Sequence, residues 1–238
     1  MAKKTNPDDF KCYPLGDAAI VIQLGNQISP LINGRVRAVC AYLDEYSFEG
    51  FIEYVPAFTT VTIYYEPWII NYNKLLPLLQ ELASEVLEQQ EVPAGTLLEI
   101  PVLYGGEWGP DLDFVASHNK MTAAEVIALH TAPDYLVYMI GFAPGFPYLG
   151  GMNELISAPR KDNPRSKIPA GSVGIAGQQT GIYPIETPGG WQIIGRSPIN
   201  LFDLNSAVPA LLKAGDRVRF SAISETEFKK IRRGRNGN

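Results

Sequence analysis

The chain has 238 residues, of which 25 are acidic, 20 are basic and 46% are hydrophobic. This composition is typical of a globular protein with one large or two small domains, and it argues against intrinsic disorder. The formal net charge of −5, with no dominant basic face in either half, makes nucleic acid a poor partner. Apolar runs are too short to span a membrane, and the first ten residues do not resemble a secretion signal. We therefore expect no membrane partner and a cytoplasmic location.

The N-terminal half alternates the hydrophobic periods of strands and helices. Short apolar runs between turn residues predict strands at residues 18–24, 50–55, 59–65 and 97–103. Amphipathic helices are predicted at residues 30–46 and 73–90, the first beginning at Ser29-Pro30 and the second carrying Pro77 in its first turn. The order β-α-β-β-α-β is that of a ferredoxin-like unit. The pattern leaves open whether the last strand closes this unit or begins the next domain.

The C-terminal half combines two short helices with many short strands. Asp111 fits the N-cap of the first helix, and Thr122 with Glu125 fits a capping box at the second. Strands are predicted at residues 135–140, 173–176, 182–185, 192–194, 200–203 and 217–220. Residues 139–200 contain 11 Gly and 8 Pro, which predicts tight corners or a ligand loop lined by backbone. Evenly spaced short strands indicate a barrel or sandwich, so the fold class is α+β.

Several common catalytic motifs are absent from the sequence. It contains no Gly-Lys dipeptide of a Walker A loop, no Gly-x-Gly of a dinucleotide or kinase loop, and no Gly-x-Ser-x-Gly elbow. With two histidines and no His-Glu-x-x-His, no metal ligand set is expected. Spacing alone therefore yields no complete catalytic set.

Cationic side chains and glycine amides gather in the glycine-rich stretch. Arg160 and Arg165 each follow a proline in PRKDNPR, and Lys167 and Arg196 flank the predicted strands. Together with the backbone N–H groups of residues 171–177, they can form an anion site. The alternative is that both arginines only pair with acidic neighbours. A separate basic cluster at residues 229–235 is typical of a frayed, solvated end.

The remaining site candidates each have a structural alternative. His130 precedes a predicted strand, where it is either a general base or, more often, a structural side chain. The aromatic residues Phe142, Phe146, Tyr148 and Trp191 either wall an apolar pocket or belong to the barrel core.

Long blocks of the sequence resemble one known family. The blocks are VYMIGFAPGFPYLGGM, PRKDNPR, IPAGSVGIAGQQTGIYPIETPGGWQIIGRSP and LFD, with YPLGDAAIVIQLG, EYVPAFTTVTIYYEP and IPVLYGGEWGPDL before them. They resemble the 5-oxoprolinase B-subunit family, also called allophanate hydrolase subunit 1 or the carboxyltransferase C/D-subdomain family, which includes an inhibitor of a sporulation histidine kinase. The resemblance spans nearly the whole chain, with Ser197 in place of an expected threonine.

The resemblance implies two domains and a shared catalytic task. A ferredoxin-like α/β domain is expected at residues 1–95, and a cyclophilin-like β-barrel at residues 96–238. The family acts with the C and A subunits of the enzyme to open 5-oxoproline to glutamate with ATP hydrolysis, so ATP is the expected cofactor, bound by this chain or by its partner. We assign catalytic roles, as hypotheses, to His130, Arg160 and Arg165. The substrate-binding candidates are Phe142, Phe146, Lys167, Gly171, Ser172, Gln178, Trp191 and Arg196.

Two other functions stay open at this point. The chain would then be a regulatory protein that binds a histidine kinase, or an allophanate- or urea-processing carboxyltransferase relative. Biotin is not expected on this chain, because no Met-Lys-Met acceptor occurs. The regulatory function predicts kinase binding by this chain alone. The carboxyltransferase function predicts carboxyl transfer or ammonia release from allophanate.

Overall fold

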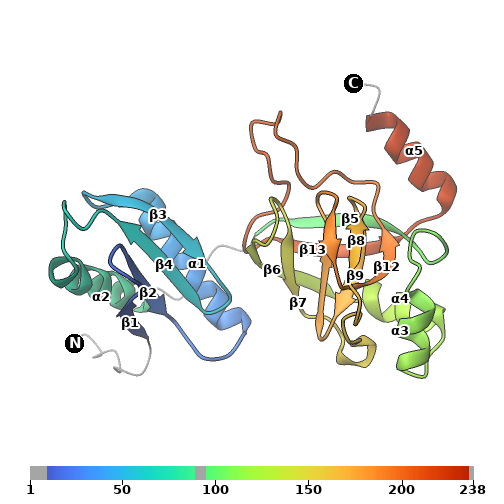
Figure 1. Cartoon of the computed structure of the whole chain (residues 1–238), viewed down its shortest axis with the longest axis horizontal. Coiled ribbons are helices and arrows are strands. Elements are labelled where there is room, and N and C mark those ends of the chain that lie inside the picture. Colours follow the sequence, from blue (N-terminus) through green and yellow to red (C-terminus); the bar gives the residue numbers. More distant parts are fainter. Residues whose placement is uncertain (1–9, 89–94, 236–238) are drawn as a thin grey trace. The chain divides into compact units, whose positions relative to one another are not determined.

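The computed structural model describes residues 10–88 and 95–235 (Figure 1). The chain divides into two compact units, residues 1–94 and residues 95–238. No helix in the described ranges is long and apolar enough to span a membrane.

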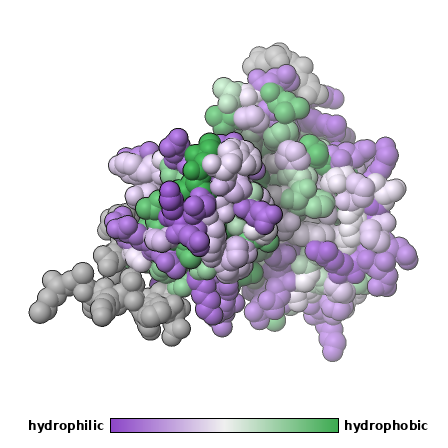
Figure 2. All heavy atoms as spheres, turned by 60° about the vertical axis from the view of Figure 1, so that its left-hand side comes forward, coloured by the Kyte–Doolittle hydropathy of each residue, from purple (hydrophilic) through white to green (hydrophobic). Residues whose placement is uncertain are grey.

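The N-terminal unit is a four-stranded antiparallel sheet with two helices. The sheet order is β1-β2-β4-β3, with bounds β1 Lys11–Pro14, β2 Ala19–Gln23, β3 Phe51–Pro56 and β4 Thr60–Tyr65. The helices are α1 (Pro30–Glu45) and α2 (Tyr72–Glu88), and their apolar residues form one buried core with those of β2 and β4. Figure 2 shows hydrophobic and hydrophilic residues interspersed on the visible face of this unit.

The predicted start of α1 is correct, whereas the predicted position of Pro77 in α2 is not. The Ser29 side chain accepts a hydrogen bond from the Ile32 N–H at 3.2 Å, which confirms the predicted start of α1. Helix α2 begins at Tyr72, so Pro77 lies inside the helix and its placement in the first turn was wrong. The carbonyl that Pro77 leaves without an N–H partner belongs to Asn73, an exposed residue, so water can satisfy it.

The C-terminal unit is a closed barrel, and this confirms the barrel and the α+β class. The strand order is β10-β7-β6-β13-β5-β12-β9. The bounds are β5 Leu97–Tyr104, β6 Asp134–Ile140, β7 Pro147–Gly150, β9 Ser172–Ala176, β10 Gln179–Ile182, β12 Gln192–Arg196 and β13 Arg217–Ala222. A separate two-stranded ribbon joins β8 (Arg165–Ile168) to β11 (Thr187–Gly189).

The strand β5 settles the question that the sequence left open. It pairs in parallel with β13 and antiparallel with β12, so it belongs to the barrel. The N-terminal sheet has β1 as an edge strand instead, and the ferredoxin-like description is therefore not confirmed.

The second unit also contains helices. They are α3 (Leu112–His118), α4 (Ala123–Thr131), the short 3-10 helix η1 (Glu154–Ile156) and α5 (Glu225–Arg235). Thr122 and Glu125 form the predicted capping box. The strand predicted at 200–203 was wrong, because only Phe202 makes a β-bridge there, to Ala210. The frayed end predicted at residues 229–235 was also wrong, since α5 runs through this segment.

Candidate functional site

The loop before α3 is fastened to strand β12. A Cβ atom on Gly109 would lie 2.0 Å from the carbonyl oxygen of Ile194, so only glycine permits this close approach. Two residues later, the Asp111 N–H donates to the Ile193 carbonyl at 2.9 Å. The loop therefore carries Asp111 to the backbone edge of β12 at Ile193.

The Asp111 carboxylate is the anchor of the site. Its side chain makes no cap hydrogen bond to α3, although Asp111 occupies the predicted N-cap position. Instead, Oδ2 accepts from the Ile193 N–H at 2.7 Å, and Oδ1 accepts from Arg165 Nη2 at 2.7 Å and from Lys161 Nζ at 3.2 Å. Burial alone would raise the pKa of Asp111, but these hydrogen bonds outweigh burial and lower it. The carboxylate is thus held ionised.

Arg165 has a donor that the protein does not use. Its Nη2 is bound to Asp111, whereas its Nη1 is buried and has no hydrogen-bond partner among the described residues. An unpaired buried N–H group is costly unless a ligand supplies the acceptor. The Asp111 pair also fixes the direction of the guanidinium. Arg165 is therefore a preorganised donor.

A small hollow of about 170 Å³ lies beside Arg165, and we call it the Arg165 hollow. Its polar and aromatic lining comes from Glu107, Trp108, Arg165, Lys167, Ser172 and Arg196. Three of these side chains are cationic and one is acidic, so the hollow favours an anion. Lys167 is partly neutralised by an exposed ion pair with Glu186 at 3.1 Å.

A larger hollow of about 550 Å³ shares Arg196 with the first, and we call it the Arg232 hollow. Its lining includes Gly171, Arg196, Ser197, Asn200, Asp203 and Arg232. At Gly171, φ is +82° and a Cβ would lie 2.3 Å from the Ser197 carbonyl oxygen, so this turn requires glycine. Arg196 lines both hollows.

Arg196 is held by uncharged groups. Its Nε donates to the Ala170 carbonyl at 2.9 Å, and its guanidinium carbon lies 5.6 Å from the centre of the Trp108 ring. Burial, and to a smaller degree the charge of Arg232, lowers the pKa of Arg196. Across residues 10–88 and 95–235, no ion pair joins Arg196 to a carboxylate. Its charge is therefore available to an anion.

The predicted aromatic residues pack against one another. Phe146 packs edge-to-face on Trp191 at 5.6 Å and on Tyr183 at 5.4 Å. Phe146 and Trp191 are buried, which favours the core alternative. Phe142 is 64% exposed, has a φ of +67° and packs on Phe146 at its edge. Only Phe142 in this cluster presents a largely exposed ring, and the role of all three in substrate binding stays a prediction.

His130 lies in the barrel interior and is fully buried. Its Nδ1 is 2.8 Å from the Tyr104 hydroxyl and its Nε2 is 2.8 Å from Thr180 Oγ1. Because the Thr180 hydroxyl donates to the Gly174 carbonyl, Nε2 carries the proton and Nδ1 accepts from Tyr104. Burial lowers the pKa of His130 to about 3. These contacts favour the structural alternative, and its catalytic role stays a prediction.

Of the other predicted site residues, two line the hollows and two do not. Ser172 lines the Arg165 hollow, and Gly171 lines the Arg232 hollow. Arg160 is exposed on the loop before β8, where its charge opposes the rise in the pKa of Tyr183 that burial causes. Gln178 is exposed in the β9–β10 turn. Neither Arg160 nor Gln178 lines either hollow.

Sequence reasoning missed four side chains of this site: Trp108, Asp111 as an anchor, Lys161 and Arg232. The pairing alternative for Arg165 is partly correct, but its acid lies 54 residues earlier in the chain and not in the neighbouring loop. The dipeptide Pro110-Asp111 before an apolar helix was the available signal, and a cap explains it equally well. The described residues contain no group of three metal-ligating side chains.

Comparisons with known proteins identify the family. A family model described as carboxyltransferase domain, subdomain C and D, matches residues 10–212. The 5-oxoprolinase B subunit of Bacillus subtilis (strain 168) is 49% identical over 229 residues, which cover 92% of this chain and 95% of that protein. The protein of the same name from Escherichia coli O157:H7 is 39% identical over 217 residues, which cover 88% and 94%.

A solved structure extends the match to the fold. The crystal structure of TTHA0988 aligns with 87% of this chain at 38% identity and a TM-score of 0.76. This chain spans 40% of the length of TTHA0988. Sequence and structure agree, and the chain belongs to the carboxyltransferase-domain family of subdomains C and D, together with the proteins named as the B subunit of 5-oxoprolinase.

Proposed function

We propose that this chain is the B subunit of an ATP-dependent 5-oxoprolinase and that it works with the partner A and C subunits. The observation that carries the proposal is the 49% identity to a protein of that name over 95% of its length. The cationic hollows support the proposal independently, because both the substrate and the nucleotide are anions. Neither hollow contains a complete catalytic set, which fits a task divided among several chains.

The chemistry of a lactam explains why ATP and cations are needed. Transfer of the ATP γ-phosphoryl group to the lactam oxygen releases ADP and activates the ring carbon. Water then adds to this carbon, the ring C–N bond breaks as nitrogen takes a proton, and a second water releases phosphate from the resulting acyl phosphate. Transfer of the phosphoryl group and release of phosphate develop negative charge on oxygen, which preorganised guanidinium groups stabilise.

The described residues suggest a division of roles in this scheme. Arg165, oriented by Asp111, would offer the accessible part of its guanidinium to the substrate carboxylate or to the lactam oxygen, since its side chain is 28% exposed. Arg196 lies between the two hollows and would contact the transferring phosphoryl group. Trp108 would keep the Arg196 guanidinium in place.

Reconstitution tests the proposal directly. The chain is purified with candidate A and C subunits, and the release of glutamate and phosphate is measured with 5-oxoproline and ATP. We expect both products at equal rates in the full mixture and neither when this chain is omitted. Turnover of allophanate instead, or full turnover without this chain, would overturn the proposal.

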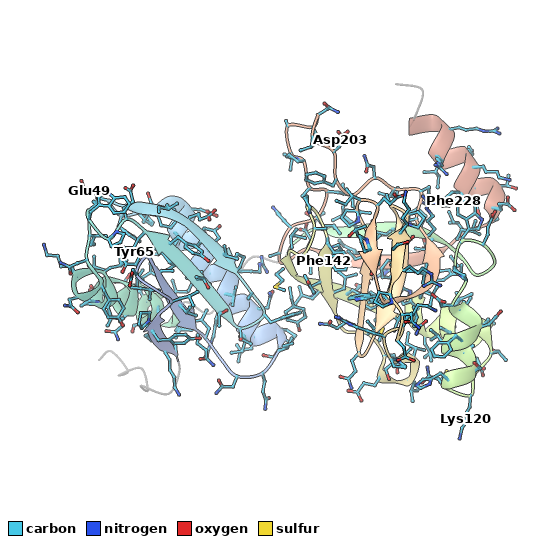
Figure 3. All side chains as sticks on the ribbon, in the orientation of Figure 1. Glu49, Tyr65, Lys120, Phe142, Asp203 and Phe228 are labelled. Atoms are coloured by element: carbon cyan, nitrogen blue, oxygen red, sulfur yellow. The ribbon has the colours of Figure 1, made fainter. Side chains whose placement is uncertain are left out.

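A matched pair of variants connects the activity to the site. Arg165→Ala in the reconstituted enzyme is expected to raise the KM for 5-oxoproline by about tenfold or more, because a charged hydrogen bond is lost. Lys120→Gln removes an exposed charge in the turn between α3 and α4 and is expected to leave the KM unchanged. Lys120 lines neither hollow, and Figure 3 shows it well away from the labelled Asp203 and Phe228 of the Arg232 hollow.

A further inference from the structure

Helix α5 lies beyond the residues that the family model matches, which end at residue 212. It is nevertheless fixed to the barrel unit. Phe228 is 1% exposed, and its ring centre lies 4.6 Å from that of Trp108, the side chain on which Arg196 rests. Figure 3 labels Phe228 on α5 and Asp203 on the loop after β12, and both line the Arg232 hollow. The helix is therefore part of the wall of this hollow.

One turn after Phe228, α5 presents Arg232 to the same hollow. Arg196 lines that hollow from β12, and the charge of Arg232 acts on it. In the part of the chain that the structure describes, no ion pair joins Arg232 to a carboxylate, whereas Lys229 on the same helix pairs with Glu225. Among the described residues, the lining contains one acidic side chain, Asp203, whose Oδ1 accepts hydrogen bonds from Asn205.

Within the described ranges, Arg196 and Arg232 line one hollow with a single acidic side chain, Asp203, so the hollow keeps a net positive charge that an anion would balance. The planar guanidinium groups suit the several oxygens of a phosphate group, which can accept from both arginines at once. The volume of about 550 Å³ exceeds that of a phosphate and lies in the range of sites for nucleotide-sized ligands.

We propose that Arg196 and Arg232 together bind a phosphate group of a nucleotide in the Arg232 hollow, with α5 supplying the second guanidinium. The choice of ATP as this nucleotide rests on the proposed function, whereas binding of a phosphate group does not. The inference therefore assigns the nucleotide phosphate to this chain, and to a helix outside the matched family residues.

Calorimetric titration of the full chain with ATP, and with inorganic phosphate as competitor, tests the inference. We expect Arg232→Ala and Arg196→Ala each to weaken ATP binding by about tenfold or more. Lys230→Ala removes the same charge from an exposed position of α5 that lines neither hollow, so binding should be unchanged. Phe228→Ala should weaken binding as Arg232→Ala does, because α5 loses its buried anchor.

The outcomes separate this inference from the proposed function. No ATP or phosphate binding by the wild-type chain, or equal losses in Arg232→Ala and Lys230→Ala, would overturn the inference. Loss of 5-oxoproline binding with ATP binding intact in Arg232→Ala would also overturn it, since the hollow would then be a carboxylate site. If ATP binding depends on Arg232 but the reconstituted mixture opens no 5-oxoproline, the inference stands and the proposed function fails.

Discussion

Substitution of Asp111 tests whether one carboxylate holds the cationic site together. Its side chain is 7% exposed and accepts three hydrogen bonds, from Arg165, Lys161 and the Ile193 N–H. Hydrogen bonds to a charged group contribute about 1.5–3 kcal/mol each. The side chains of Arg165 and Lys161 are 28% and 30% exposed. When Asp111 is removed, water can therefore hydrogen-bond to them and replace part of the lost hydrogen-bond energy. We expect Asp111→Ala to cost about 2–4 kcal/mol of unfolding free energy, and Asp111→Asn about 1–2 kcal/mol.

Urea unfolding followed by tryptophan fluorescence measures this loss. A Trp68→Phe background leaves Trp108 and Trp191, both in the barrel unit, as the tryptophans of the chain. For a unit of this size, the expected loss in Asp111→Ala corresponds to a fall in Tm of about 6–12 °C. Unfolding free energies within about 0.5 kcal/mol of the parent for both variants would refute the anchoring role.

The parent and Asp111→Asn also differ in how their stability depends on pH, and the direction of this difference can be predicted. The pKa of Asp111 is lower in the folded protein than in the unfolded chain, so its contribution to stability is full above the unfolded pKa of about 3.9. That contribution is lost as pH falls through the folded pKa. The difference in stability between the parent and Asp111→Asn should therefore shrink between about pH 5 and pH 2. A difference that stays constant over this range would contradict the assignment.

Three further substitutions test the other side chains of the site. His130→Gln should lower stability at pH 7 by about 1–3 kcal/mol and leave the pH–rate profile of the reconstituted enzyme unchanged. In the parent, the folded pKa of His130 near 3 makes protonation favour the unfolded chain between about pH 6.5 and pH 3, so stability falls in that range. His130→Gln should reduce this fall in stability. An altered profile would restore the general-base hypothesis. Trp191→Ala should cost about 3–5 kcal/mol in urea unfolding, and lost activity with stability intact would indicate a pocket wall instead. Arg160→Ala should raise the KM for 5-oxoproline less than Arg165→Ala does, because Arg160 lines neither hollow, and equal effects would support the role first assigned to Arg160.

Elements with a local signal could be predicted from the sequence. The Ser29 cap and the Thr122–Glu125 capping box depend on residues within one helical turn, and both are present as expected. The even spacing of short strands predicted a barrel or a sandwich, and the structure has the barrel. Strand β1 was missed, since the four residues Lys11–Pro14 alternate too briefly to show a period.

Long-range pairing explains what the sequence could not show. Whether β5 closes the first unit or opens the second depends on its partners β12 and β13, which lie about a hundred residues later. The same limit applies to the site, where Arg165 meets an acid 54 residues away. The C-terminal segment misled for another reason. Its charges suggested a solvated end, whereas the buried side chain of Phe228 docks the helix.

Arg196 allows a test of whether its free charge serves stability or binding. Burial and the charge of Arg232 lower the pKa of Arg196, so both disfavour its charged form. The Ala170 carbonyl that accepts its hydrogen bond belongs to an exposed residue, so water can replace Arg196 there. Arg196→Met keeps an unbranched side chain of similar length against Trp108 while it removes the repulsion. A group retained for binding costs stability, so this variant should unfold at the same or a higher urea concentration than the parent and lose ATP binding. A loss of more than about 1 kcal/mol would show that Arg196 is a structural side chain, and its unpaired charge would then no longer support a ligand.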